Sequence, residues 1–210
     1  MLRLALGCLL VVPLLAPAQE LKPIELPKPQ TEGGKPLMQV LNERKSARQF
    51  STQKLPPQVL SNLLWAAFGV NRPDGRRTAP SASNMQEIDI YVALPEGLYL
   101  YDAKGHRLVP VVAEDLRAAT GSQPFVGQAP LNLVYVADYA RMGSRPDDAK
   151  VFYSAADTGF ISQNVYLYCA SEGLATVVRA TVDRQKLAAQ MKLRPEQRIV
   201  LAQTVGYPAK

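Results

Sequence analysis

Apolar residues recur along the chain with two different spacings. Between residues 56 and 68 they fall on one face of a helix, which begins at Pro56-Pro57 and ends at Gly69. From Ile88 to Leu94 the period changes to two, the alternation typical of a strand. Along the whole chain the two periods predict helices over 37–45, 56–68, 112–120, 157–172 and 183–191, and strands over 88–94, 97–101, 106–111, 131–137, 174–178 and 198–205. This order lacks a regular strand–helix–strand rhythm, so it favours an α+β fold over a doubly wound sheet.

The first 36 residues follow neither period. Residues 1–18 combine Arg3, an apolar run and small residues up to Ala18, the layout of a cleavable signal peptide. An uncleaved anchor is the alternative, but the apolar run is shorter than the roughly 20 residues of a membrane span. We therefore expect a periplasmic or secreted protein, cut after Ala18 and free of the membrane after signal removal. Residues 19–36 are rich in proline and predict a weakly packed tail or linker before one domain over 37–210.

Composition narrows the chemistry. The net charge of +6 is dispersed, without a basic block interleaved with aromatic residues, so nucleic-acid binding is not favoured. Cys169 is the single cysteine after residue 18 and is expected in the core, and the single histidine, His106, is expected at the surface of a hairpin. The sequence offers no metal-ligand spacing, Gly-rich phosphate loop or Ser-His-Asp set, so we nominate no metal site and no catalytic side chain. A bound cofactor is the expected source of any chemistry.

A first polar cluster, Arg44-Lys45-Ser46-Ala47-Arg48, directly follows a predicted helix. Guanidinium groups supply forked donors for phosphate oxygens, and a serine hydroxyl adds another donor. A solvated helix end is the alternative interpretation of this cluster.

A second polar segment, residues 80–86, precedes the strand that starts at Ile88. Its small residues allow the backbone to approach a flat ring, and its Ser, Asn and Gln side chains offer donors and acceptors. An ordinary polar loop is again the alternative.

Taken together and in this order, the two segments resemble the nitroreductase superfamily. That family carries an Arg-x-Ser-x-Arg segment after its first helix and a later Pro-Ser-x-x-Asn-x-Gln loop. The matching positions are Arg44, Ser46 and Arg48, and then Pro80, Ser81, Asn84 and Gln86. Segments over 157–164, 173–176 and 205–208 also look like the family, so the resemblance covers about residues 37–208.

The resemblance implies a mostly antiparallel sheet flanked by helices, and a homodimer with FMN at its interface. It implies three groups of cofactor-binding residues. The first group, between Arg44 and Arg48, would hold the phosphate, the ribityl chain and the pyrimidine edge of FMN. Within it, Lys45 would act through its backbone or its charge, and Arg48 would also stabilise the reduced flavin. The second would reach the flavin bound mainly by the other subunit, and the third would lie beside the ring and present a backbone N–H. These groups are Arg44, Lys45, Ser46 and Arg48; Pro80, Ser81, Ala82, Asn84 and Gln86; and Val178, Arg179 and Ala180. For Arg179, an exposed strand-end cation is the alternative.

The implied function is an exported FMN-dependent oxidoreductase. It would transfer electrons or hydride in two steps, with NAD(P)H as possible donor, to a small electron-poor acceptor such as a nitroaromatic or a quinone. Nicotinamide cofactors are scarce outside the cytoplasm, which leaves the donor open. A peptide-tailoring, azoline-type dehydrogenase is one alternative, because residues 97–102 are similar to the branch that acts on thiazole/oxazole-modified peptides. A non-enzymatic flavin or small-ligand binding protein is another.

Two positions depart from the family. Many members extend past the last strand with basic residues, whereas this sequence ends at Lys210, so either Lys210 substitutes or phosphate binding is weaker. The Trp or Pro that often follows the second motif is replaced by Glu87-Ile88, which leaves the rim of the substrate pocket undefined.

Overall fold

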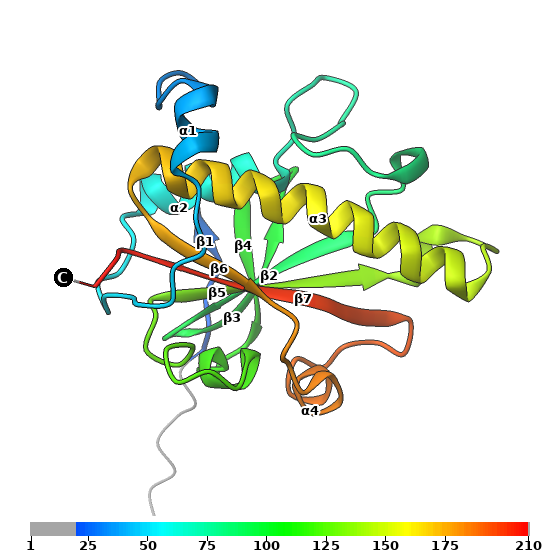
Figure 1. Cartoon of the computed structure of the whole chain (residues 1–210). Coiled ribbons are helices and arrows are strands. Elements are labelled where there is room, and N and C mark those ends of the chain that lie inside the picture. The colour runs from blue at the N-terminus through cyan, green and yellow to red at the C-terminus, as the bar shows by residue number, and fades with distance from the viewer. Residues whose placement is uncertain (1–19, 210) are drawn as a thin grey trace, which may run out of the picture.

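The computed structural model describes residues 20–209 as a mixed α+β domain (Figure 1). The predicted signal peptide and Lys210 lie outside the described residues. Residues 20–209 form one seven-stranded sheet in the order β1-β4-β3-β2-β5-β7-β6, and every pair of neighbours is antiparallel. The mostly antiparallel sheet implied by the resemblance is therefore confirmed.

The elements follow the predicted order except for β1, which was not predicted, and the helix over 112–120, which is absent. The strands are β1 (Ile24–Glu25), β2 (Ile88–Leu94), β3 (Gly97–Asp102), β4 (Arg107–Val112), β5 (Leu131–Asp138), β6 (Ala175–Arg179) and β7 (Gln197–Gly206). The helices are α1 (Leu37–Glu43), α2 (Pro57–Phe68), α3 (Asp147–Glu172) and α4 (Arg184–Gln190), with short 3-10 turns η1 (Ala82–Asn84), η2 (Arg117–Thr120) and η3 (Tyr139–Met142).

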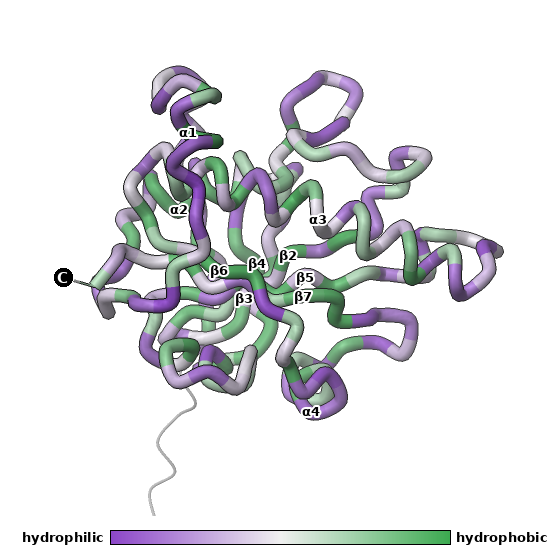
Figure 2. Tube along the Cα trace, in the orientation of Figure 1, coloured by the Kyte–Doolittle hydropathy of each residue, from purple (hydrophilic) through white to green (hydrophobic). Residues whose placement is uncertain are grey.

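Alternating side chains of the sheet build two separate cores. Ile88 and Ile90 of β2 belong to the larger core, which α2 and α3 cover, whereas Tyr91 belongs to the smaller core on the opposite face. Leu187 and Met191, from α4 and the residue after it, close that second face. Figure 1 shows α3 and α4 on opposite sides of the sheet, and Figure 2 shows the apolar strands between them.

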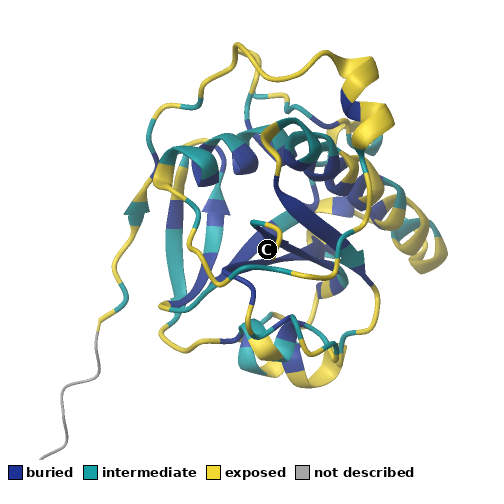
Figure 3. Ribbon diagram, turned by 60° about the vertical axis from the view of Figure 1, so that its left-hand side comes forward, coloured by how far each residue is buried: buried dark blue, intermediate teal, exposed yellow. Residues whose placement is uncertain are grey.

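The centre of the sheet is fully enclosed. Every residue of β5 is buried, and the hydroxyl of Tyr135 on this strand donates to Gln203 Oε1 at 2.6 Å on β7. Figure 3 shows that the central strands are buried, whereas α1 is largely exposed. The loss of water around these strands is the main stabilising contribution to such a core.

Two predicted helices differ from the structure. The helix over 112–120 is wrong: β4 runs to Val112, and only the 3-10 turn η2 follows, where the Asp115 carboxylate accepts the Arg117 N–H and competes with helix formation. The helix predicted from residue 157 begins ten residues earlier, at Asp147. Its first turns place Val151 and Phe152 in solvent, so they lack the one-sided apolar stripe on which the prediction depended.

The weakly packed tail expected over 19–36 is also corrected in part. Ile24 pairs with Leu108 of β4, and Leu26 is only 9% exposed in the larger core. The Ser61 hydroxyl of α2 donates to the Pro27 carbonyl at 2.6 Å, which holds the segment against the domain. Proline residues prevent a long strand but leave room for these few contacts.

His106 is half-buried rather than a free surface residue. Its Nε2 lies 2.7 Å from Ser61 Oγ and its Nδ1 lies 3.0 Å from the Tyr101 hydroxyl. Because Ser61 uses its proton on Pro27, the Nε2–H donates to Ser61 and the Tyr101 O–H donates to Nδ1. This arrangement uses the neutral imidazole, and burial lowers the pKa of His106.

The His106 contacts predict an acid-dependent loss of stability. A lowered pKa in the folded state means that stability is fully present above the ordinary histidine value, about 6.5, and is lost as pH falls through the folded value. Urea unfolding of the protein and of His106→Asn should therefore give a stability difference that shrinks as the solution is acidified. Asparagine suits the positive φ of 48° at this position. Parallel pH profiles for the two proteins would contradict the assignment.

Candidate functional site

The basic segment, Arg44 to Arg48, runs along the free edge of the sheet. Helix α1 ends at Glu43, and Arg44 already has the extended ψ of 123°. The Ala47 N–H then donates to the Thr176 carbonyl of β6 at 2.9 Å. Since β6 is the last strand of the sheet, this bond covers part of its open edge. The structure thus places the first predicted group along β6, the strand that contains Val178 and Arg179 of the third group.

Tyr166 of α3 fixes how these two segments meet. Its hydroxyl accepts the Val178 N–H at 2.9 Å and lies 2.9 Å from Ser46 Oγ, with either hydroxyl able to donate. The Arg44 guanidinium stands over the Tyr166 ring at 5.4 Å, a cation–π arrangement. The sequence pattern showed Tyr166 only as a residue of a long helix, because its partners are distant in the chain.

The cations of the basic segment are available for a ligand. Within residues 20–209, no ion pair or hydrogen bond uses the side-chain nitrogen atoms of Arg44, Lys45 or Arg48. Arg48 and Lys45 are exposed, and Arg44 is half-buried. A row of unpaired cations next to a hydroxyl is the donor set that an anionic group such as a phosphate requires.

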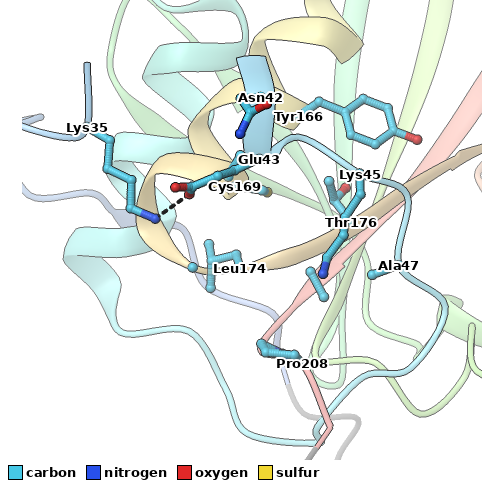
Figure 4. A pocket seen from close by; sticks show the side chains of 13 residues that line it. Lys35, Asn42, Glu43, Lys45, Ala47, Tyr166, Cys169, Leu174, Thr176 and Pro208 are labelled. Carbon is cyan, nitrogen blue, oxygen red and sulfur yellow. Dashed lines mark hydrogen bonds and ion pairs between the residues drawn. The ribbon is translucent and has the colours of Figure 1, made fainter. Parts of the chain in front are cut away.

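A cavity of about 540 Å³ lies beside this segment (Figure 4). Lys45 and Ala47 line it, whereas Ser46 and Arg48 do not, as expected for alternate positions of extended backbone. Its other walls come from α1, the end of α3, the start of β6 and Pro208. Lys35 and Glu43 form an ion pair of 2.6 Å at its edge, and the Lys35 hydrogen bond lowers the pKa of Glu43. Its volume is in the range of small-molecule sites.

The Arg179 side chain lies inside the protein. It is 6% exposed and donates to the Thr120 carbonyl at 2.7 Å, to Asn132 Oδ1 at 3.0 Å and to Thr204 Oγ1 at 2.9 Å. Burial lowers its pKa to about 10. The alternative of an exposed strand-end cation is therefore wrong, and any contact from Arg179 to a ligand beside β6 is made by its backbone. The polar Asn132 and Thr204 within apolar strands were the available signal.

Only some backbone N–H groups of β6 and the residue after it can still donate to a ligand. On an edge strand, alternate residues direct their polar backbone groups away from the sheet. Thr176 and Val178 occupy such positions, and they bond to Ala47 and to Tyr166. Ala180 follows directly after β6 and is exposed. Ala180 is thus the exposed member of the third group, which also contains Val178 and the buried Arg179, and its backbone is accessible to a ligand.

The second motif forms a strained loop over 80–86. Ser83, Asn84 and Gln86 have positive φ values of 52°, 55° and 49°, which cost free energy for residues other than glycine. The Ala82 N–H donates to Asp157 Oδ2 of α3 at 2.9 Å, one of several bonds that hold this conformation.

More polar contacts fix the rest of the loop. Ser81 Oγ accepts the Gln86 N–H at 3.0 Å, and Gln86 Oε1 accepts from Arg77 Nε at 2.8 Å. Arg145 donates to Ser83 Oγ at 3.1 Å. Pro80 and Asn84 are exposed, so part of the loop remains open to solvent.

The loop and the basic segment do not meet within one chain. They attach to α3 at Asp157 and Tyr166, nine residues apart. At 1.5 Å per residue this separates the two attachment points by roughly 14 Å along the helix. The structure therefore joins the first and third motifs and leaves the second at a distance.

Other functional groups are scarce in the described part of the chain. Residues 20–209 contain no cluster of three or more His, Cys, Asp or Glu side chains suited to a metal ion. No helix in this range is long and apolar enough to cross a membrane. Cys169 is fully buried, as predicted, and burial raises the pKa of its thiol.

Comparisons with known proteins agree on one family. The model of the nitroreductase family matches residues 41–207. A protein of Methanocaldococcus jannaschii assigned as a nitroreductase is 34% identical over 151 residues, which are 67% of this chain and 76% of the relative.

Solved structures share the fold. A Ralstonia eutropha protein assigned as a nitroreductase has 47% identity and a TM-score of 0.87, with 97% of each chain covered. The Escherichia coli microcin synthetase complex, solved with truncated pro-MccB17 bound, contains a chain with 21% identity and a TM-score of 0.72, with 80% of this chain and 70% of that chain covered. Nitroreductase A of Vibrio parahaemolyticus has 22% identity and a TM-score of 0.62, with coverage of 83% and 68%. The family match and the 34% identical relative show that this chain belongs to the nitroreductase family of oxidoreductases.

Proposed function

We propose that this protein is an exported FMN-dependent oxidoreductase that delivers electrons to small electron-poor acceptors such as nitroaromatics or quinones. The observation that carries the proposal is the unpaired basic segment, with its Ser46 hydroxyl, bound along the edge of β6. The family assignment supplies the expectation of a flavin and of a nicotinamide donor.

The residues present suit an FMN molecule. Arg44 and Arg48 offer cations for a phosphate, and Ser46 offers a hydroxyl for the phosphate or the ribityl chain, whereas Lys45, at the alternate position, would act through its backbone or its charge. The exposed backbone after β6, at Ala180, offers an N–H for the ring system. A cation at the pyrimidine edge, for which Arg48 is our candidate, favours the anionic reduced form. FMN, when bound, supplies the electron or hydride transfer, and the protein supplies orientation and charge.

A homodimer is part of the proposal. Large apolar side chains are exposed on α1 and on α3, and such surface groups mark interaction sites. They are Leu37, Met38, Leu41, Val151, Phe152, Tyr153 and Phe160, with exposed fractions between 37% and 76%. A second copy packed there would cover these groups. It would also allow its 80–86 loop to reach a flavin held by the basic segment.

The peptide-tailoring alternative receives little support from the hairpin that suggested it. Tyr99 and Tyr101 are 2% and 6% exposed and belong to the larger core, so they do not form a peptide-binding surface. The likeness to the microcin synthetase chain, at 21% identity, concerns the fold alone. The small-acceptor function is therefore preferred, and the binding-protein alternative is decided by experiment.

The first experiment is an absorption spectrum of the protein purified from its own compartment. We expect a flavin band that bleaches with NADH, NADPH or a chemical reductant and returns on adding a nitroaromatic. A reductant other than nicotinamide is included because export separates the protein from the cytoplasmic pool. A colourless protein that takes up no added FMN would refute the proposal, and a flavin that no acceptor reoxidises would favour the binding-protein alternative.

The second experiment removes single cations from the basic segment. A hydrogen bond to a charged group contributes about 1.5–3 kcal/mol, so Arg44→Ala or Arg48→Ala should weaken FMN binding by roughly 10- to 150-fold. Fluorescence titration of the flavin-free protein measures this change. Lys186→Ala on the other face is the matched control, because it removes the same charge from an exposed helix. FMN affinity unchanged in both arginine variants would mean that the segment does not bind phosphate.

The third experiment places a charge on the apolar surface of α3. Phe152 is 68% exposed, so Phe152→Glu is tolerated by the monomer fold but opposes burial in an interface. We expect the variant to elute as a monomer in size-exclusion chromatography with light scattering and to retain less FMN. Ala189→Glu on exposed α4 should change neither property. A wild-type monomer that holds FMN tightly would rule out a site shared between subunits.

A further inference from the structure

Glu87 is a buried carboxyl group without a hydrogen-bond partner. It directly follows the 80–86 loop, its exposed fraction is 0%, and neither of its carboxyl oxygens bonds to any group in residues 20–209. An ionised carboxylate in such a place costs far more free energy than a neutral acid, because it loses water and gains nothing in return. The position therefore favours a protonated side chain.

Two charged groups face Glu87 from the elements packed around it. Asp157 of α3, which is 2% exposed, lies against it and adds a like charge. Arg141 of η3 adds a weaker opposite charge, since its guanidinium already bonds to Asp89 Oδ2 at 2.5 Å and to the Gln86 carbonyl at 2.8 Å. Burial first, and then Asp157, raise the pKa of Glu87 to about 7.

The same Asp157 holds the strained loop. Its Oδ2 accepts the Ala82 N–H at 2.9 Å, at the start of the turn in which Ser83, Asn84 and Gln86 have positive φ. A loop that stores strain needs such bonds to keep one conformation. The carboxylate of Asp157 has further acceptor capacity, and a protonated Glu87 is the neighbouring donor that can use it.

We propose that Glu87 is a positioning residue that stays protonated and donates a hydrogen bond to Asp157, and that this acid–carboxylate pair locks the 80–86 loop in its cofactor-contacting conformation. The contact between the loop and the cofactor rests on the proposed function, whereas the pairing of Glu87 with Asp157 does not. Loss of the proton places two carboxylates together in a buried site, and their repulsion releases Asp157 from the loop. The 80–86 loop then leaves its strained conformation, and the flavin loses its contacts with this loop.

The direction of the pH effect follows from the raised pKa. The locked state binds the proton more tightly than an open state in which Glu87 meets water. The lock is therefore complete below the ordinary glutamate value of 4.5 and weakens as pH rises towards about 7, above which it changes no further. Glu87→Gln keeps a donor of the same shape towards Asp157 but cannot ionise.

The first test is FMN affinity against pH for the wild-type protein and Glu87→Gln. The wild-type dissociation constant should rise by about tenfold or more between pH values of about 5 and 8, whereas the glutamine variant should stay tight over this window apart from changes common to both proteins. Glu87→Asp, which titrates but is shorter, is expected to bind weakly at every pH. Equal pH profiles for wild type and Glu87→Gln would overturn the proposal.

A second test needs no cofactor. Infrared difference spectra of the flavin-free protein should contain the carbonyl band of a neutral carboxylic acid that is absent in Glu87→Gln and fades as pH approaches about 7. Limited proteolysis within residues 81–86 should accelerate over the same range in wild type only. A protein that shows both effects but never binds FMN supports the lock and refutes the flavin function. Absence of the band in the properly folded protein refutes the lock, even if FMN binds.

Discussion

The hydroxyl of Tyr166 is the contact on which the candidate site depends. It accepts the Val178 N–H from β6 and reaches Ser46, while its ring lies under Arg44. One side chain of α3 therefore fixes the distance between the basic segment and the edge strand. Edge strands expose unpaired polar groups, and here a tyrosine and one extended segment occupy them so that a limited stretch of backbone stays open.

Buried hydrogen bonds hold the other side of β6. The Arg179 guanidinium is buried, and it donates to the Thr120 carbonyl, to Asn132 Oδ1 and to Thr204 Oγ1. These three bonds gain strength from the low local dielectric, although the buried Arg179 Nε has no hydrogen-bond partner within residues 20–209. They tie β6 to β5 and β7, so the outer edge is presented by a rigid rather than a loose strand. The hydrogen bonds of Arg179 inside the sheet thereby fix the position of the outer edge of β6, along which a ligand can lie.

Local sequence patterns predicted the elements but not the long-range contacts. The spacing over 56–68 is confirmed as α2, where burial on one face imposes the helical period. The segment from Ile88 to Leu94 is confirmed as β2, although its alternating side chains enter two different cores. The start of α3 was hidden because Phe152 and its neighbours are apolar yet exposed. Tyr166 and Arg179 gave no local signal, since their partners lie 12 to 120 residues away for Tyr166 and 25 to 59 for Arg179. Motif order singled out the basic segment, but only three-dimensional contacts show which of its atoms have no partner within residues 20–209.

Helix α3 also decides how a complete site is assembled. Nine residues separate Asp157 from Tyr166, and at about 100° per residue the two side chains leave the helix on opposite sides. Each chain then carries two half-sites that face apart. In the proposed dimer, a subunit defective only in its loop and a subunit defective only in its basic segment complement one another: one site receives both faults and the other receives none. Mixed dimers would regain half of the normal sites, a genetic signature that a self-contained subunit never produces.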